Sequence, residues 1–404
     1  MTVHGLRRVL ARAFRRALES VDLEERVRET MPRVPATVRR GAIVAVGKAA
    51  PAMARGALAV VDDRFTRVLV VAPDGTEARL RDPRVLVLRA AHPDPDERSV
   101  KAARQALGVV ADADFVIALV SGGASSLLCL PVDGHLPAYV RAAHAVLTGG
   151  ADVRALNVLR RHACLAKGGG LTRAAGGPVR TLIASDVLHG EAFDVGSGPT
   201  VPDPTTRAEA RRVLSRYAKG VKAPALHESL KPREAAAKRS RARFVARPDD
   251  LARELAEELR GKLKHVRVLR PTTEPVESVA REYAERARSL ARGEAVVRAA
   301  EPSLAVVARR PGRGGRSTHL GAMVAPELGE GVVLLAAASD GVDGASETGG
   351  ALVDGSLEGR VGRESLERAL TRFDTGSVLV AAGMALPSGP TGTNLADVHV
   401  LARV

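Results

Sequence analysis

The sequence predicts an α/β protein with two domains, each built on a mostly parallel sheet, and with an interdomain cleft. The 404 residues are enough for two ordinary domains. Short apolar runs alternate along the chain with amphipathic segments of helical length, which is the rhythm of βαβ units. A segment rich in Lys, Arg and Pro at 219–243 interrupts this rhythm and predicts domains at 1–240 and 241–404.

Five compact apolar runs in the first half predict buried strands. Each is bounded by Gly, Pro or charged residues, as is typical of strands that helices cover on both faces. The runs lie at 43–46, 68–71, 85–88, 115–120 and 181–184. Helices are predicted between several of them, at 49–60, 98–110 and 138–147. In the second half the same reasoning predicts helices at 249–261 and 276–292 and strands at 266–270, 304–308, 332–338 and 378–382.

The composition indicates a soluble enzyme and argues against a nucleic-acid or membrane role. Hydrophobic residues make up 45% and charged residues 26% of the chain. The net charge of +15 is spread along the sequence, and aromatic residues, which stacking on single strands requires, are only 2%. No apolar run approaches the ~20 residues that span a bilayer. Two cysteines, Cys129 and Cys164, form no disulfide framework and fit a reducing cytoplasm.

An Arg-rich amphipathic segment at 6–18 permits two interpretations. A transit peptide has this composition, and so does the first helix of a domain. The acidic residues Asp22, Glu24 and Glu25 follow directly, and no small-residue cleavage site is present. We therefore interpret the segment as a helix of the first domain.

Glycine-rich turns follow two strands of the first domain, at the sheet edge where open α/β sheets bind ligands. Gly47 and Lys48 stand between the strand at 43–46 and the next helix. This place favours an anion, although a lysine there is often only a helix cap. The turn lacks the Gly-Lys-Ser/Thr ending of a Walker A loop. Ser121-Gly122-Gly123 either offers backbone N–H groups to a carboxylate or phosphate or forms a simple tight turn.

Acidic residues follow other strands and predict metal or base sites. Asp186 comes just after the strand at 181–184, and Asp340 and Asp343 follow the strand at 332–338. A carboxylate at a strand end can hold Mg²⁺ or accept a proton, but it can also cap a helix or form a turn. Gly314-Gly315-Arg316 places an arginine in a glycine-rich loop, where it can reach a phosphate.

In their order along the chain and in their residues, these motifs resemble those of the glycerate 2-kinase family with its C-terminal MOFRL-type domain. The resemblance covers residues 41–400. It rests on Gly47 to Ala50, His92-Pro93 with Pro95-Asp96, Ser121 to Gly123, Asn157 with Arg160 and His162, Lys167 to Gly169, Ser185 to Val187, Ser197 to Asp203, Gly314 to Arg316, Ser339 to Gly344 and Gly389 to Asn394. It implies a Rossmann-like glycerate kinase domain at 1–240 and a MOFRL-type α/β domain at 241–404.

The implied activity is ATP-dependent phosphorylation of glycerate, or of a closely related hydroxy acid, with ATP and Mg²⁺ as cofactors. We expect the 2-hydroxyl to be phosphorylated, giving 2-phosphoglycerate, by a cytoplasmic monomer or homodimer whose partners are the small acid and ATP.

The resemblance marks Lys48, Arg316, Asp340 and Asp186 as catalytic positions. We assign Lys48 and Arg316 to the charge of the polyphosphate or the transition state. Asp340 is assigned to the attacking hydroxyl and Asp186 to Mg²⁺, two roles that are open to exchange, and Asp343 is expected as a second metal ligand. Substrate or nucleotide binding is expected of Gly47, Ser121, Gly122, Gly123, Asn157, Arg160, Lys167, Ser197, Gly198, Gly314, Gly315, Thr391 and Asn394. Of these, we expect the turn at 121–123 to hold the acid's carboxylate.

Departures from the family pattern leave two alternatives open. Ser317-Thr318-His319 replaces the usual Asn-Gln-Glu beside the arginine, and His189-Gly190 replaces the usual Gly-Asp. A changed polar shell can alter which acid is accepted, so one alternative is a family member that binds a metabolite without kinase activity. The other is a hydroxypyruvate reductase, which the missing Gly-x-Gly-x-x-Gly fingerprint after an early strand disfavours.

Overall fold

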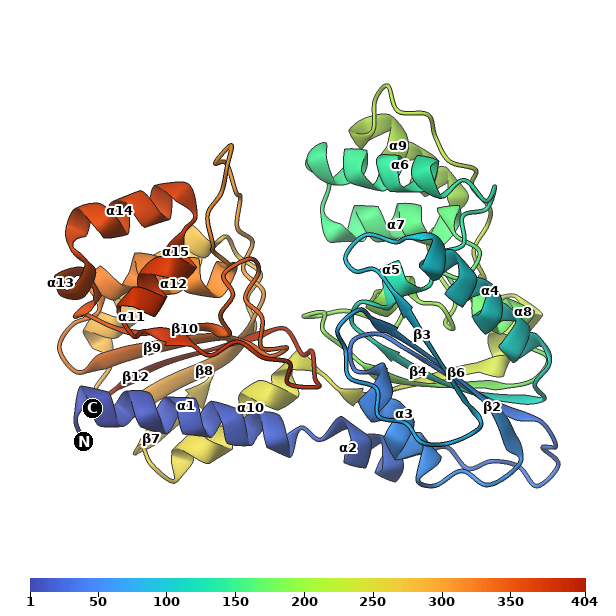
Figure 1. The fold of residues 1–404 in the computed structure, drawn as a ribbon, viewed down its shortest axis with the longest axis horizontal. Coiled ribbons are helices and arrows are strands. Elements are labelled where there is room, and N and C mark those ends of the chain that lie inside the picture. Colours follow the sequence, from blue (N-terminus) through green and yellow to red (C-terminus); the bar gives the residue numbers. More distant parts are fainter. The chain divides into compact units, whose positions relative to one another are not determined.

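The chain folds into two compact units, each with its own sheet (Figure 1). The structure, a computed structural model, describes all 404 residues. The N-terminal unit consists of Leu23–Ala246, and the C-terminal unit consists of Arg247–Val404 together with Met1–Asp22. The unit boundary lies at 246/247 rather than at the expected 240/241, because β6 (Ser240–Ala246) completes the first sheet.

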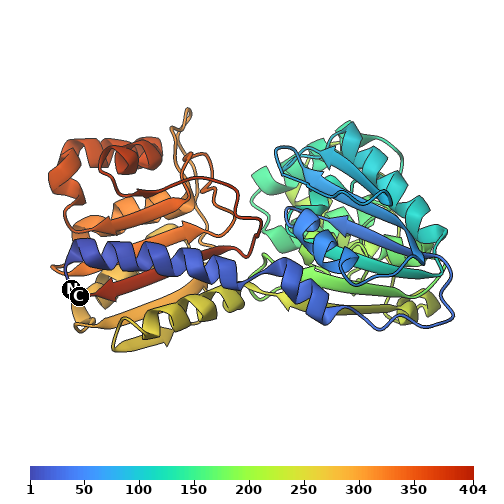
Figure 2. The same cartoon turned by 60° about the horizontal axis from the view of Figure 1, so that its bottom comes forward.

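The first residues of the chain belong to the C-terminal unit, not to the first domain in which we expected them. α1 (Val3–Ser20) is the helix that the period at 6–18 predicts, and it buries Leu6, Leu10, Ala13 and Ala17. This apolar stripe packs beside α10 (Pro248–Arg260) and against the C-terminal sheet, as Figure 2 shows. The arginines of α1 lie mostly on its opposite, exposed face.

The N-terminal sheet has six strands, all parallel, in the order β3-β2-β1-β4-β5-β6. Its strands are β1 (Gly41–Val46), β2 (Phe65–Pro73), β3 (Val85–Ala90), β4 (Phe115–Ser121), β5 (Val179–Ala184) and β6. The five predicted strands and the parallel arrangement are confirmed. The sixth was missed because it is an edge strand in which arginines interrupt the apolar pattern.

Helices cover both faces of this sheet, with α2 and α3 on one side and α4 on the other (Figure 1). The helices are α2 (Leu23–Thr30), α3 (Ala50–Leu58), α4 (Glu97–Ala111), α5 (Ala124–Leu127), α6 (Leu136–Thr148), α7 (Val153–Ala163), α8 (Gly170–Ala174) and α9 (Arg207–Tyr217), with short 3₁₀ turns at Val195–Ser197 and Ala235–Arg239. The strand order reverses between β1 and β4, so their connections leave in opposite directions. Such a reversal opens a crevice at the carboxyl ends of the two strands.

The C-terminal sheet is mixed, which corrects the expectation of a mostly parallel sheet there. Its order is β11-β10-β9-β12-β8-β7, and of these five pairings only β7 with β8 is parallel. The strands are β7 (His265–Val268), β8 (Glu294–Ala300), β9 (Val332–Ala338), β10 (Gly350–Asp354), β11 (Ala385–Leu386) and β12 (Asp397–Arg403). No helix separates β9 from β10, so the two strands run antiparallel. β12 lies between β8 and β9 and runs opposite to both.

Two strands predicted in the second half are absent. Residues 304–308 lie in the connection after β8, where Val307 is 85% exposed, and residues 378–382 fall mainly in α15 (Thr375–Ala381). A short apolar run alone cannot distinguish a strand from a helix. The other helices of this unit are α11 (Val276–Ser289), α12 (Arg316–Val324), α13 (Leu357–Val361) and α14 (Arg363–Arg372), with a 3₁₀ turn at Ala325–Glu327. None of the helices in the structure is both long and apolar enough to cross a bilayer.

A buried polar chain joins α11 to the middle of the C-terminal sheet. The Tyr283 hydroxyl lies 3.0 Å from His399 Nδ1 and accepts a hydrogen bond from Arg298 Nε at 2.9 Å. Arg298 Nη2 donates in turn to Glu282 at 2.6 Å. Burial lowers the pKa of His399 to about 3, and the charges of Arg298 and Arg316 add to this effect. The imidazole is therefore neutral in the folded protein.

We expect His399 to make the protein less stable in mild acid. Its pKa is about 3 when folded and about 6.5 when unfolded, so between these values the unfolded state binds more protons. The contribution to stability is complete above pH ~6.5 and declines by up to about 1.4 kcal/mol for each pH unit below it. Urea unfolding of the wild type and His399→Gln between pH 4.5 and 7.5 measures this. Equal pH slopes for the two proteins would contradict the prediction.

Candidate functional site

The turn after β1 is fixed by the end of β4, its neighbour across the strand-order reversal. Lys48 N–H donates to Gly122 O at 2.8 Å, and Ala49 N–H donates to Ser121 Oγ at 3.1 Å. Gly47 has φ +126°, and a Cβ there would lie 2.1 Å from Ser121 Oγ. Only glycine therefore allows the two strand ends to approach this closely. The main chain of Lys48 is thus held in the expected crevice.

The glycine turn after β4 lies against the Lys48 side chain. Gly123 is left-handed, with φ +85°, and a Cβ built on it would lie 3.4 Å from Lys48 Cγ and 3.2 Å from the His92 ring. The predicted residues Lys48, Ser121, Gly122 and Gly123 are therefore brought together. Asp186, half-buried, follows β5, the next strand along the same carboxyl edge. The sequence prediction of one polar edge holds within this unit.

Three more predicted residues lie beside α5. Ser197 Oγ donates to Asn157 Oδ1 at 3.0 Å and lies 2.9 Å from Ser125 Oγ. Ser197 and Gly198 are joined to the segment before α8 by main-chain bonds, because Gly168 N–H and Gly169 N–H donate to their carbonyls at 3.0 and 2.7 Å. Hydrogen bonds therefore connect Asn157, Ser197 and Gly198 into one group. We refer to this group below as the wall.

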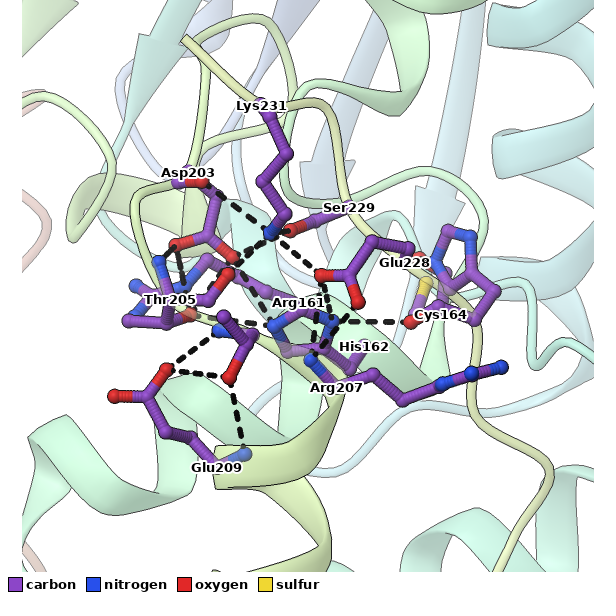
Figure 3. A network of polar contacts seen from close by, with 12 residues as sticks. Arg161, His162, Cys164, Asp203, Thr205, Arg207, Glu209, Glu228, Ser229 and Lys231 are labelled. Carbon is purple, nitrogen blue, oxygen red and sulfur yellow. Dashed lines mark hydrogen bonds and ion pairs between the residues drawn. The ribbon is translucent and has the colours of Figure 1, made fainter. Parts of the chain in front are cut away.

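A buried carboxylate, Asp203, anchors this wall (Figure 3). It accepts hydrogen bonds from Ser229 Oγ at 2.7 Å and Thr205 Oγ1 at 2.8 Å, and it lies 3.1 Å from Arg161 Nε and 3.4 Å from His162 Nε2. Both Asp203 and Arg161 are almost inaccessible to solvent. The network therefore positions the 197–203 segment on α7 rather than meeting a ligand. Sequence reasoning missed Arg161, because only the tertiary structure reveals its partner.

Lys167, predicted to bind substrate, is instead buried with 1% of its surface exposed. Its Nζ donates to Leu128 O at 2.7 Å and to Cys164 Sγ at 3.3 Å. Burial lowers the pKa of Lys167, but the neighbouring Cys164, Tyr139 and Cys129 more than offset this, so the pKa lies above its ordinary value. In this structure the lysine is a charged internal support whose partners all belong to the protein.

In the C-terminal unit, Arg316 is the first residue of α12 and is held by two carboxylates. Its Nε and Nη2 donate to Asp397 at 2.7 and 3.1 Å, and its Nη1 donates to Glu301 at 3.3 Å. Burial lowers the pKa of Arg316, but the charges of Asp397 and Glu301 outweigh this and raise it. About one third of the side chain, 32%, remains exposed. The guanidinium is therefore fixed, charged and still accessible.

Asp343 caps α12, so it does not fit the expected role of metal ligand. Its two oxygens accept the Ser317 and Thr318 N–H groups at 3.0 and 2.7 Å. The residue is 2% exposed, and burial together with the nearby Asp397 charge raises the pKa of its carboxyl. A Cβ on Gly315 would lie 2.3 Å from this carboxylate. Gly315, and Gly314 before it, thus serve the close packing of the cap.

The residues that depart from the family pattern point inward. Ser317 Oγ donates to Asp397 at 3.2 Å, and Thr318 Oγ1 accepts the Gly315 N–H at 2.9 Å. The His319 ring stacks on Phe373 with centroids 5.0 Å apart, and burial lowers the pKa of His319. The three side chains therefore support the start of α12 and the packing behind it. None adds a charge beside the exposed part of Arg316.

Asp340 lies after β9, at the same sheet edge as the Arg316 pair. Asp397 begins β12 and is paired in register with Ala338, the last residue of β9. Asp340 is half-buried and accepts the Val342 N–H at 3.1 Å. Thr391 Oγ1 donates to Ser339 O at 2.5 Å, which holds the 389–394 loop, and with it Asn394, next to this turn.

A cavity of about 480 Å³ lies at the opposite edge of this sheet, near the start of β9. Arg7, Asp354 and Arg360 line it. It mixes both signs of charge and contains none of the predicted residues. In the N-terminal unit the candidate residues lie at the carboxyl ends of β1, β4 and β5. In the C-terminal unit they lie at the carboxyl end of β9 and at the start of α12.

Comparisons with known proteins agree with the motifs over nearly the whole chain. Residues 9–230 match a domain of unknown function, DUF4147, and residues 291–397 match the MOFRL family. A D-glycerate 2-kinase of Thermotoga maritima is 31% identical over 98% of both chains. A putative hydroxypyruvate reductase of Agrobacterium vitis is 32% identical over 98% of this chain and 94% of its own. The crystal structure of a glycerate kinase from Thermotoga maritima has a TM-score of 0.84 at 27% identity and covers 99% of this chain and 100% of its own.

The cap assigned to Asp343 predicts that the two aspartates after β9 differ in their effect on stability. Asp343→Ala removes two hydrogen bonds to a helix start and should cost about 1–3 kcal/mol of unfolding free energy. The matched variant Asp340→Ala, at a half-exposed turn, should change it by less than about 0.5 kcal/mol. Urea unfolding of both variants measures this. Equal destabilisation by the two would contradict the assignment.

Proposed function

Because the chain belongs to the glycerate 2-kinase family, we propose that it transfers the γ-phosphoryl group of ATP to the 2-hydroxyl of glycerate. The observation that carries this proposal is the position of the family's charged residues. Lys48 lies at the strand-order reversal of one sheet, and Arg316 and Asp340 lie at one edge of the other. Strand ends of this kind are where α/β folds bind ligands.

Phosphoryl transfer asks for fixed positive charge rather than for covalent chemistry by the protein. The transferred group spreads negative charge over its oxygens, so positioned cations supply most of the catalysis. Lys48 has its main chain fixed by Gly122, and Arg316 has its guanidinium fixed by Asp397. The Arg316 guanidinium is therefore held in place before the reaction. We assign both cations to the charge of the phosphates, with Arg316 acting where this charge grows.

The acceptor hydroxyl needs a carboxylate that orients it or takes its proton. Asp340 suits this role because it is half-buried and lies at the edge that Arg316 shares. Asp343, whose two oxygens are occupied by helix N–H groups, does not. The products of the proposed step are ADP and 2-phosphoglycerate.

Of the two residues expected to bind Mg²⁺, only Asp186 suits this role. Mg²⁺ in nucleotide sites is usually held by one or two carboxylates, with phosphate oxygens and water completing six ligands. Asp186 offers a half-buried carboxylate at the same strand edge as Lys48, whereas Asp343 is committed to α12. The ion would neutralise phosphate charge. Asp186 and Asp340 are similarly exposed, so the roles of metal ligand and of hydroxyl partner can also be exchanged between them.

One relative is named a putative hydroxypyruvate reductase, but this chain has no matching dinucleotide site. The strand order of the N-terminal sheet also occurs in dinucleotide-binding folds. However, the turn after β1 reads Gly47-Lys48-Ala49 and continues with Ala50 and Pro51, without the further glycines that admit a pyrophosphate. NADH oxidation with hydroxypyruvate, without ADP release from ATP and glycerate, would favour the reductase.

The kinase proposal predicts that removing either cation mainly lowers kcat. Lys48→Ala and Arg316→Ala should each reduce kcat by about 10²–10³-fold, because these charges act most strongly in the transition state. A coupled ADP-release assay with glycerate measures this. Lys101→Ala and Arg270→Ala remove exposed charges from the same two units and should leave kcat unchanged. Near-normal kcat in both site variants would contradict the proposed roles.

A further inference from the structure

A small cavity in the N-terminal unit is lined by residues of α5, α6 and α7 and of the segment just before α4. Its volume is about 20 Å³, and Arg160, Ser125, Ser126 and Tyr139 contribute to its walls. Ser126 Oγ donates to Gly123 O at 3.0 Å, and Gly123 in turn packs against the Lys48 side chain. Ser126, in the wall of the cavity, is therefore hydrogen-bonded to the turn that lies beside Lys48.

Arg160 brings a positive charge to this cavity without a protein partner. It is half-buried and makes no hydrogen bond or ion pair within the chain. Asp94, at the rim, is paired with His144 at 2.8 Å instead. A guanidinium that has lost part of its water, and whose neighbouring carboxylate is already paired with another group, gains from binding an anion.

A second positively charged side chain lies near Arg160. The buried Lys167 lies close enough that the Arg160 charge lowers the Lys167 pKa, although other groups raise that pKa overall. The neighbouring hydroxyls are committed elsewhere. Ser197 donates to Asn157, so the Ser125 hydroxyl donates to Ser197, and the Ser126 hydroxyl donates to Gly123 O. The guanidinium is therefore the principal free donor in the cavity.

The size of the cavity selects the kind of anion. A space of 20 Å³ accommodates one or two water-sized groups, which matches the two oxygens of a carboxylate. Sites for whole small molecules occupy about 300–1,000 Å³, so neither a nucleotide nor a long acid fits inside. Arginine binds carboxylates through two parallel hydrogen bonds.

From these observations we propose that Arg160 binds the carboxylate of the acceptor acid and so selects short hydroxy carboxylates. This inference rests on the proposed kinase function, and it moves the carboxylate from the Ser121–Gly123 turn, where we expected it from the sequence, to α7. The turn is then left to the phosphate groups beside Lys48. Neutral polyols of the same length would lack the group that Arg160 recognises.

Steady-state kinetics of Arg160→Gln tests this role, with glycerate and ATP varied in turn. We expect KM for glycerate to rise about 10–100-fold, as the loss of a charge-assisted pair implies, while KM for ATP stays unchanged. Arg160→Lys, which keeps the charge but not the paired donors, should recover part of the loss. Arg154→Gln removes an exposed charge from the same helix and should match the wild type. Thermal melts of all variants check that they are folded.

Binding measurements separate this inference from the kinase proposal itself. Titration calorimetry with glycerate and with neutral glyceramide needs no turnover. Glycerate binding that weakens in Arg160→Gln, with glyceramide binding unchanged, supports the inference even if the wild type releases no ADP. A rise in KM for ATP alone, unchanged glycerate constants, or equal weakening toward both ligands would overturn it.

Discussion

The ion pair between Arg316 and Asp397 is the contact on which the arrangement of the candidate residues in the C-terminal unit depends. It joins the start of α12 to the start of β12, two elements that are 81 residues apart. Ser317 donates to the same carboxylate, and Asp343 caps the same helix. Removing the arginine would leave the nearly inaccessible Asp397 carboxylate without its main counter-charge. The sheet, the helix cap and the arginine are therefore fixed together. Residues 317–319, at which this chain departs from the family pattern, help to hold the start of α12 in place.

The candidate residues of the N-terminal unit are held in place by different contacts. Lys48 is held by main-chain hydrogen bonds between two strand ends, and this close approach needs glycine at position 47. Asp203, with Arg161 and Ser229, then secures the wall that carries Ser197. Three charged residues near these contacts differ in their burial and in their partners. Asp203 and Lys167 are buried and satisfied by the protein, whereas Arg160 is half-buried and has no protein partner.

Sequence reasoning found the parallel sheet because its strands are continuous apolar runs with clear boundaries. It missed β12, in which Asp397 and His399 interrupt the apolar pattern, and it mistook part of α15 for a strand. It located Lys48, Asp186 and Asp340 at strand ends, and Arg316 after a glycine-rich loop, through their motifs. It could not tell that Asp343 and Lys167 are buried, because a charged residue beside glycine has the same sequence pattern whether it meets a ligand or the protein's own main chain. Their partners are set by tertiary structure.

The proposed function assigns both Lys48 and Arg316 to the charge of the transferred phosphate, and a double-mutant cycle tests this assignment most directly. The measured quantity is kcat/KM for glycerate in the wild type, Lys48→Ala, Arg316→Ala and the double variant. Residues that act as a unit give strongly non-additive losses. We expect that kcat/KM of the double variant is only a little lower than that of the more damaged single variant. A loss equal to the product of the two single losses would contradict it, because the two cations would then act independently.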